Sequence, residues 1–388
     1  IVAFEQAKYA QKLGLDLIIT DHHEPQGTKR PDAFCKIHSI KICGTAVAWT
    51  LFKDEELLDL VAMATVADMM PLMGVNRVLV KEGLKKLNQT KRVGLLALFN
   101  EAGIEKENIT SYEIGHIIAP RLNAMGRLEH AIDSLRLLCT KDPLKAKKLA
   151  DLVGETNDKR KLLTQEAVGE AKLLVNKSAG IHVLSSKNWN PGIIGLVAAR
   201  ICEETGKPSI AISMGEEHSK GSARSNGTVN MVKIIRSCED LLVAVGGHEG
   251  AAGFTIATKN VKEFRQRLEK LMDKETVLEE PILEIEAEVN LENLTLNLAK
   301  KLQDFEPFGI ENPKPLLATY NMKLENLRTV GDEKHLKGRV DGIDFIAFGM
   351  GEMINVLQNG QFVNLAYTLE IDHWDNREKL QLVIKAIL

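Results

Sequence analysis

The sequence predicts an α/β protein of several domains, with a long helix between two α/β units and a small β-barrel at the end of the chain. Three observations support this prediction. Apolar runs alternate with amphipathic helical patterns in two stretches, a charged pattern with few helix breakers lies between them, and the last part changes to short strands with turn glycines. A length of 388 residues is enough for two or three domains.

The composition is that of an ordinary globular protein, with 44% apolar and 27% charged residues. No apolar stretch is long enough to span a bilayer and no signal peptide is visible, so we expect no membrane association. The five cysteines are scattered without CxxC spacing, which indicates the cytoplasm and argues against a zinc–thiolate site. A net charge of −3 means that any contact with DNA depends on local basic groups.

Residues 1–140 form the first predicted domain, which starts inside an amphipathic helix that ends at Gly14. A strand at Leu17–Thr20 follows. Further helical patterns lie at 45–52, 54–67, 77–87, 93–101, 112–118 and 131–139. Because the chain opens on the helix before a strand, and on Ile1 instead of methionine, we expect this domain to lack its N-terminal portion.

Residues 141–178 predict a connecting helix, either one long helix or two in series. A second α/β domain is predicted at 179–275, with strands Ile181–Leu184 and Ser209–Ile212 on either side of the helix Gly195–Thr205. The last domain, 281–388, has short strands, turn glycines and a single helix near its start. These features suit a five-stranded barrel of the OB type.

The tripeptide Asp21-His22-His23 closes the apolar run Leu17–Thr20. Open α/β sheets place their sites at the carboxyl ends of strands, where these side chains stand. Imidazole nitrogens and carboxylate oxygens together suit Mn²⁺, Zn²⁺ or Fe²⁺, and a pair of such ions can clamp a phosphoryl group. The alternative is one histidine that caps a loop and one that is merely exposed.

A further candidate ligand, Asp68, follows the helical pattern at 54–67 and precedes Pro71. A carboxylate at a helix end, with proline close behind, is held rigidly and could complete a metal shell begun by His22. The alternative is a capping or turn aspartate.

Two glycine-rich segments of the second domain, Gly221–Ser225 and Gly246–Gly253, leave backbone amides open to an anion. Arg224 could form a bidentate pair with a phosphate, and His248 could donate a hydrogen bond to one. The alternative for the Gly-Gly-His segment is a tight strand-to-helix connection packed against the sheet.

Taken in order, these motifs resemble the DHH phosphoesterase superfamily and, within it, the RecJ family of bacterial single-strand-specific exonucleases. Three more segments carry the resemblance: Ala119–Arg127 (APRLNAMGR), Trp189–Gly195 (WNPGIIG) and Glu306–Pro315 (EPFGIENPKP). The last resembles the start of the family's OB domain, and the similarity covers essentially the whole chain.

The resemblance implies a role for each matched residue. His22 and Asp68 would be metal ligands, and His23 would lie beside the metals and the scissile phosphate. Asp21 would orient the imidazoles, and His248 would contact the phosphate. The positions implied to contact nucleic acid are Arg121, Asn123, Arg127, Ser222, Arg224, Ser225, Gly246 and Gly247.

The sequence departs from the family pattern at two places. The family supplies further ligand aspartates upstream of the Asp-His-His motif. Here only 20 residues precede Asp21, and their single aspartate, Asp16, is at the wrong end of its strand. The second departure is Asn190, where the family pattern has histidine, which puts one minor contact in doubt.

The activity implied by the resemblance is 5′-to-3′ hydrolysis of single-stranded DNA with two Mn²⁺ or Mg²⁺ ions, in DNA repair and recombination. We expect a cytoplasmic monomer, with a single-strand-binding protein and a helicase as further partners. His248 and Arg224 are expected to face the metals across a cleft between the α/β domains. The barrel is expected to stack bases on its aromatic residues, namely Tyr320, Phe345, Phe348 and Trp374.

Two alternatives stay open. A DHH-family phosphodiesterase for oligoribonucleotides or cyclic dinucleotides would use the same chemistry, but such enzymes usually stop before a barrel. A non-catalytic single-strand-binding fragment would account for the missing aspartates. For the same reason we expect the chain as given to bind single strands but to hydrolyse DNA poorly or not at all.

Overall fold

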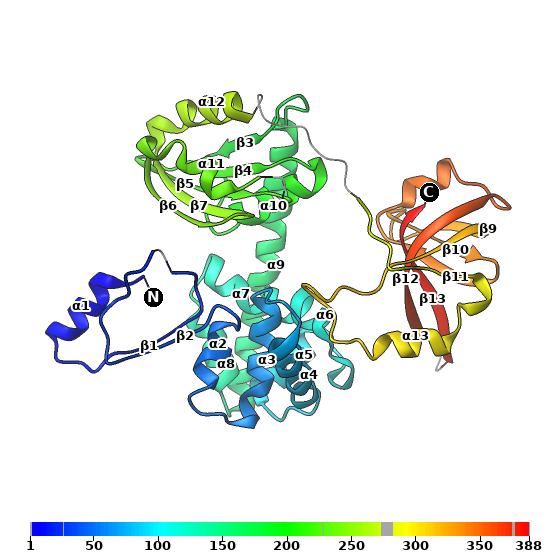
Figure 1. Ribbon diagram of the computed structural model, residues 1–388, viewed down its shortest axis with the longest axis horizontal. Helices are drawn as coiled ribbons and strands as arrows, with labels where there is room; N and C mark the ends of the chain where they lie inside the picture. The colour runs from blue at the N-terminus through cyan, green and yellow to red at the C-terminus, as the bar shows by residue number, and fades with distance from the viewer. Residues whose placement is uncertain (1, 26, 228, 273–281, 375–376, 388) are drawn as a thin grey trace. The chain divides into compact units, whose positions relative to one another are not determined.

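The computed structural model describes residues 2–25, 27–227, 229–272, 282–374 and 377–387. Figure 1 labels the helices and strands along the chain, which divides into two compact units. The first comprises Ile1–Gln89, Asn108–Ile114 and Ile282–Leu388, and the second comprises Thr90–Glu107 and Gly115–Pro281. Among the described residues, no helix combines the length and apolar character needed to cross a bilayer.

The first unit opens with helix α1 (Phe4–Lys12) and two parallel strands, β1 (Ile18–Asp21) and β2 (Cys35–His38). The predicted strand is thus found, one residue later than expected. Its register places Asp21 opposite His38, so the carboxyl ends of both strands lie side by side. Ile18 is 55% exposed, which shows that this apolar run is only partly covered by the described residues.

Three helices follow: α2 (Gly44–Trp49), α3 (Leu58–Ala67) and α4 (Gly74–Asn88). Helices α3 and α4 pack tightly, because a Cβ atom at Gly83 of α4 would come within 2.3 Å of the Leu58 carbonyl oxygen. Only glycine fits such a close approach. This packing holds the first half of α3, the helix that Asp68 follows.

The barrel belongs to the same unit. Its strands pair in the order β10 (His335–Val340), β11 (Ile343–Ala347), β13 (Arg377–Ile387), β12 (Phe362–Trp374) and β9 (Leu317–Val330), and β9 pairs back with β10 to close it. The short β8 (Ala287–Glu288) lies beside β9. Helix α13 (Leu296–Gln303) follows Thr295, whose hydroxyl caps it by accepting from the Leu298 N–H. The predicted five-stranded OB-type barrel is confirmed.

The expectation of short strands is wrong for β9, β12 and β13. These strands continue through irregularities instead of ending at them: β9 has left-handed residues at Asn321 and Asn326, and its pairing with β12 shifts register. Such bulges and kinks let a strand curve round a barrel without stopping.

The helices at the start of the second unit are α5 (Val93–Ala102), α7 (Ala119–Leu128), α8 (Ile132–Cys139) and α9 (Pro143–Leu174). The connecting segment is therefore one long helix, of 32 residues, and its N-terminus is capped by the Asp142 carboxylate. The predicted helix at 112–118 is instead the short α6 (Ser111–Glu113) followed by a π-helix, Ile114–Ile118, which leads into α7.

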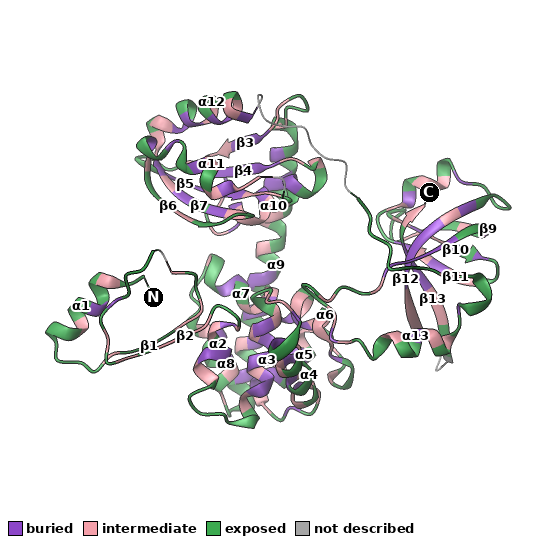
Figure 2. Ribbon diagram, in the orientation of Figure 1, coloured by how far each residue is buried: buried purple, intermediate pink, exposed green. Residues whose placement is uncertain are grey.

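A five-stranded sheet forms the rest of the second unit, in the order β3 (His182–Ser186), β4 (Ser209–Ser213), β5 (His218–Arg224), β7 (Ala251–Ala257) and β6 (Leu242–His248). Strands β3 and β4 are parallel and the other pairs are antiparallel. One face packs against α11 (Met231–Arg236) and α12 (Val261–Met272), and the other against α9 and α10 (Ile194–Thr205). Figure 2 shows the buried residues concentrated along these strands.

Short 3-10 turns complete the described elements, at Glu55–Leu57, Lys106–Asn108, Glu239–Leu241, Thr258–Asn260, Leu291–Asn293 and Gly351–Asn355.

Candidate functional site

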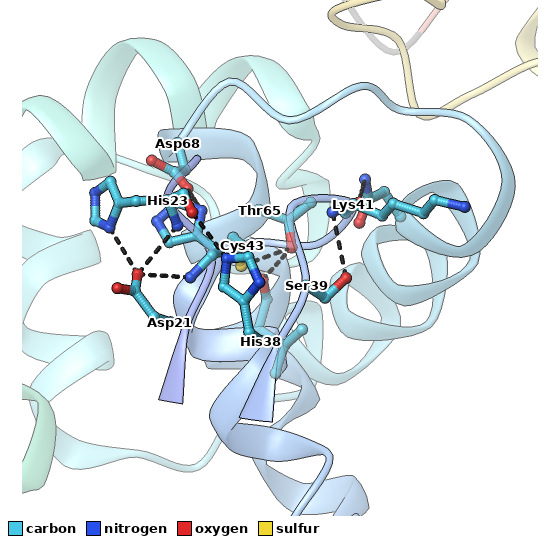
Figure 3. Close-up of polar contacts among 11 residues, drawn as sticks. Asp21, His23, His38, Ser39, Lys41, Cys43, Thr65 and Asp68 are labelled. Atoms are coloured by element: carbon cyan, nitrogen blue, oxygen red, sulfur yellow. Dashed lines mark hydrogen bonds and ion pairs between the residues drawn. The ribbon is translucent and has the colours of Figure 1, made fainter. Parts of the chain in front are cut away.

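The Asp21 carboxylate organises the end of β1 (Figure 3). One of its oxygens, Oδ1, accepts hydrogen bonds from the backbone N–H of His22 at 2.7 Å and of His23 at 3.0 Å, and lies 2.7 Å from Nδ1 of the His23 ring. Partial burial alone would raise the pKa of the Asp21 carboxyl, but the hydrogen bonds lower this pKa well below its usual range. Asp21 is thus ionised, and it orients the His23 ring.

The His22 ring faces a different carboxylate. Its Nδ1 atom lies 3.3 Å from Oδ2 of Asp68, the residue that ends α3. The end of α3 is well defined, because the N–H of Asp68 donates to the Ala64 carbonyl and that of Met70 to the Thr65 carbonyl. Met69, between them, has a left-handed φ of 53°. The predicted meeting of a strand end and a helix end is therefore present in the structure.

Two residues that sequence reasoning missed also support this centre. A Cβ atom at Gly44 would lie 3.2 Å from Cδ2 of His22, so glycine leaves room for the imidazole. The His38 ring contacts the His23 carbonyl oxygen through Nε2, at 2.8 Å. His38 could have been suspected from sequence, because it ends an apolar strand just as Asp21 does.

The donor set of this centre suits a divalent metal ion such as Mn²⁺, since it offers an imidazole nitrogen and a carboxylate oxygen close together. It is a partial set. In the described ranges, no three side chains of His, Cys, Asp or Glu gather closely enough to hold a metal ion. His22 and Asp68 therefore fit two positions of a metal centre that needs further ligands.

The second unit contains an open pocket of about 570 Å³ at the ends of α10 and β5. Its basic and polar lining comprises Arg127, Lys220, Ser222, Arg224 and Thr255, and Gly195 and Gly246 are among its small residues. A Cβ atom at Gly195 would lie 3.2 Å from both the Arg224 guanidinium and the Ser222 hydroxyl, so glycine keeps them accessible. Four predicted residues thus line one pocket, together with Lys220, which the prediction missed.

Positive charge accumulates beside this pocket. Burial lowers the pKa of the Arg224 guanidinium, and the nearby charge of Arg127 lowers it further. Arg160 of α9 is affected in the same way by burial and by the charges of Arg127 and Arg121, and its Nε atom, shielded from solvent, has no hydrogen-bond partner among the described residues. A bound anion would relieve the repulsion within such a cluster.

Two other residues predicted to contact nucleic acid, Arg121 and Ser225, have local structural partners. Arg121 forms an ion pair with Glu101 at 2.9 Å and is 14% exposed. The Ser225 hydroxyl accepts hydrogen bonds from the N–H groups of Gly227 and Val229, which closes a turn. Asn123 is exposed on α7.

Gly247 and His248 end β6 and are exposed, and neither lines the pocket. Gly247 has a φ of 143°, and a Cβ atom there would come within 2.3 Å of the Ala251 carbonyl oxygen. The alternative prediction of a tight connection is thus half right, since the turn is tight but joins β6 to β7 in a hairpin, not to a helix.

Asn190, the departure from the family pattern, has a clear local role. Its side-chain oxygen accepts a hydrogen bond from the N–H of Gly192 at 2.8 Å, which forms a turn. Arg127 in turn donates to the Gly192 carbonyl oxygen at 3.2 Å. The Asn190 turn therefore helps to seat Arg127 beside the pocket.

The barrel exposes aromatic side chains at Tyr320 and Phe348, 50% and 56% exposed, and at Phe362, which was not predicted. Phe345 was predicted as a stacking residue, and this is wrong. It is 1% exposed and packs in the barrel core, because its position in β11 points inward. The Trp374 side chain lies outside the described residues. Arg328 and Lys337 are paired across β9 and β10 and add positive charge.

Comparison with known proteins matches the DHHA1 domain at residues 174–274 and the RecJ OB domain at residues 285–386. The chain is 34% identical to the single-stranded-DNA-specific exonuclease RecJ of Bacillus subtilis, over 99% of this chain and 52% of the relative. It is 30% identical to the single-stranded-DNA-specific exonuclease RecJ of Escherichia coli, over 98% of this chain and 74% of the relative. The crystal structure of Thermus thermophilus RecJ in complex with Mn²⁺ matches with a TM-score of 0.89 at 29% identity, covering 100% of this chain and 60% of the other.

An Asp-His-His strand end, followed along the chain by a DHHA1 domain and an OB barrel, defines the class of DHH phosphoesterases that carry an OB domain. Within that class, the chain belongs to the RecJ family. It spans about half the length of the Bacillus subtilis relative, at 52%.

Proposed function

We propose that this chain carries part of the metal centre and the DNA-binding surfaces of a single-strand-specific 5′-to-3′ exonuclease that acts in DNA repair and recombination. The observation that supports this most directly is the 3.3 Å approach of His22 and Asp68 at the carboxyl end of β1. The similar Thermus thermophilus structure is described as a complex with Mn²⁺, and a second one as a complex with Mg²⁺.

His22 and Asp68 would hold one divalent ion, Mn²⁺ or Mg²⁺. Such ions, when bound, polarise the scissile phosphate and lower the pKa of the attacking water. His23, held by Asp21, would donate a hydrogen bond to a phosphate oxygen beside the metals. Asp21 remains ionised and keeps that ring from rotating, which is the usual role of a carboxylate behind a histidine.

The pocket at Arg127 and Arg224 would take a phosphate of the strand, and Arg160 would add charge behind it. His22 and Asp68 belong to the first unit, whereas Arg224 and His248 belong to the second. The arrangement of His248 and Arg224 across a cleft from the metals therefore stays a prediction. Exposed aromatic residues of the barrel would stack bases without sequence preference.

The competing function is single-strand binding without catalysis, which the incomplete ligand set of the described residues favours for this chain. A phosphodiesterase for small nucleotides is less well supported, since a barrel of about a hundred residues suits a longer substrate. Partners such as a single-strand-binding protein or a helicase, a monomeric state and a cytoplasmic location remain part of this proposal.

The deciding experiment measures Mn²⁺ binding and single-strand binding by the chain and by its His22→Gln and Asp68→Asn variants. Loss of metal binding with retained DNA binding supports the proposal. Metal binding that is unaffected by both substitutions contradicts it.

A further inference from the structure

The segment Asp304–Asn312, which leads from α13 into the barrel, is fixed by hydrogen bonds along its whole length. We call it the docking segment. The carbonyl groups of Asp304 and Glu306 accept from the Arg77 guanidinium, at 3.1 and 3.0 Å. Those of Phe305 and Pro307 accept from the Asn312 side-chain amide, at 3.0 and 2.9 Å.

The remaining carbonyls of the docking segment are engaged as well. That of Phe308 accepts from the Ser111 hydroxyl at 2.6 Å, and that of Gly309 accepts from the Asn312 N–H at 3.1 Å. That of Ile310 accepts from the N–H of Leu72 at 2.7 Å. Every carbonyl from Asp304 to Ile310 thus has a donor. A connection between domains is normally solvated and variable, so this complete set indicates a fixed joint.

The surface under the docking segment is the turn that carries the candidate metal ligand. Leu72 lies four residues after Asp68, is 2% exposed, and has Pro71 before it. A Cβ atom at Gly309 would come within 2.6 Å of Cδ1 of Leu72, so the docking segment approaches this side chain as closely as glycine permits. All these residues belong to the first unit.

We propose that the docking segment is a positioning element for Asp68, so that seating of the barrel sets the geometry of the His22–Asp68 pair. The inference rests on the proposed function, because it treats Asp68 as a metal ligand. The turn from Asp68 to Leu72 is short, contains a proline and includes the left-handed Met69, and it therefore has little freedom to absorb a shift at Leu72. By linkage, metal bound at Asp68 would in turn stabilise the docked barrel.

The test uses the full chain with histidine-selective isotope labelling and compares the wild type with the double variant Arg77→Met/Ser111→Ala. This variant removes the side-chain donors to three carbonyls and substitutes no residue of the barrel or of the His22–Asp68 pair. Lys85→Met is the matched control, because Lys85 lies on the same helix and forms its ion pair with Glu82, away from the docking segment. The signal that is missing from the spectrum of His22→Gln is assigned to the His22 ring. The spectrum of Asp68→Asn then gives the position of this signal when the partner carboxylate is lost.

Without metal, the His22 signal of the double variant should move toward that of Asp68→Asn, and the signal of Lys85→Met should stay at the wild-type position. In an Mn²⁺ titration, the metal concentration at which the His22 signal loses half of its intensity should be about five- to tenfold higher for the double variant than for the wild type. Gly309→Val, which forces the segment from Leu72 by bulk alone, should give the same result. Faster exchange of the Leu72 amide shows that a variant has undocked.

An unchanged His22 signal in an undocked variant overturns the inference. If Mn²⁺ fails to broaden the His22 signal of the wild type, the proposed metal centre is wrong, whereas the metal-free comparison still decides whether docking positions Asp68.

Discussion

His22 and His23 are adjacent in sequence, with ring centroids 4.5 Å apart, yet each ring faces a different carboxylate. His22 lies against Asp68 from the end of a helix, and His23 lies against Asp21 from its own strand. The two imidazoles are therefore not equivalent. His22 pairs with Asp68, which is distant in sequence and could share a metal ion with it, whereas the His23 ring is held in place by the nearby Asp21.

Replacing either His22 with Gln or Asp68 with Asn should weaken Mn²⁺ binding at least about tenfold, because each removes a ligand of the proposed centre. Isothermal titration calorimetry of the chain measures this affinity. Asp16→Asn serves as the control, since Asp16 is exposed and distant from the strand end. Equal losses in all three variants would point to nonspecific binding.

Gly44→Ala should weaken the same metal binding several-fold while the fold is retained. The added Cβ atom would lie 3.2 Å from the His22 ring, and the ring must shift to accept it. Gly169→Ala on α9 is the matched control, because nothing lies within 4 Å of a Cβ atom there. That change should leave metal binding as it is and stabilise the helix by about 0.5–1 kcal/mol.

Arg224→Ala should weaken binding to a single-stranded oligonucleotide and reduce the slope of log K against log salt by about one. Arg200→Ala, an exposed change on α10, should alter neither. Ser225→Ala should also leave binding nearly unchanged, since its hydroxyl serves the turn at Gly227 and Val229. Fluorescence anisotropy across a salt series distinguishes these outcomes, and a full effect of Ser225→Ala would return that residue to the DNA-binding set.

Stability should fall as pH drops below about 6.5 because of His182. This ring is 2% exposed, and burial, with a smaller contribution from Lys207, lowers its pKa in the folded state. At a pH between the lowered pKa and the ordinary pKa, the unfolded chain binds more protons than the folded chain. The contribution of neutral His182 to the free energy of unfolding is therefore fully present above this pH window and is lost as the pH falls through it. Thermal unfolding at pH 5.5 and 7.5 should show a smaller pH effect in His182→Leu than in the wild type, whereas the exposed His218→Gln should behave as the wild type does.

The chain by itself should hydrolyse 5′-labelled single-stranded DNA with Mn²⁺ far more slowly than the Bacillus subtilis relative, yet still bind it. The described residues supply only two of the proposed metal ligands, and two cations held by so few negative groups would repel each other. A side-by-side assay at equal concentration measures both properties. Comparable turnover would mean that other carboxylates, such as Glu24 or Asp32, complete the centre.

Local patterns were sufficient to predict the strand end, the helix that delivers Asp68 and the helical connection at 141–178, because each depends on the periodicity of nearby residues. They did not decide between one long helix and two in series, and the structure shows one, α9. Phe345 was misassigned because the direction in which a barrel strand faces depends on pairing with strands distant in sequence. The docking segment was recognisable as a motif, but its purpose was not. Its partners Arg77 and Ser111 lie 227 and 197 positions from the carbonyls of Asp304 and Phe308, beyond the reach of any local signal.

The docking segment also determines where the barrel can be exchanged in protein engineering. A chimera joined inside Asp304–Asn312 would combine carbonyls from one parent with donors from another, and a single inserted residue would put every later carbonyl out of register. A junction at the exposed residues Ile282–Leu283 keeps the segment and the barrel together as one cassette. The recipient must then supply an arginine, a serine and a buried leucine at the positions of Arg77, Ser111 and Leu72.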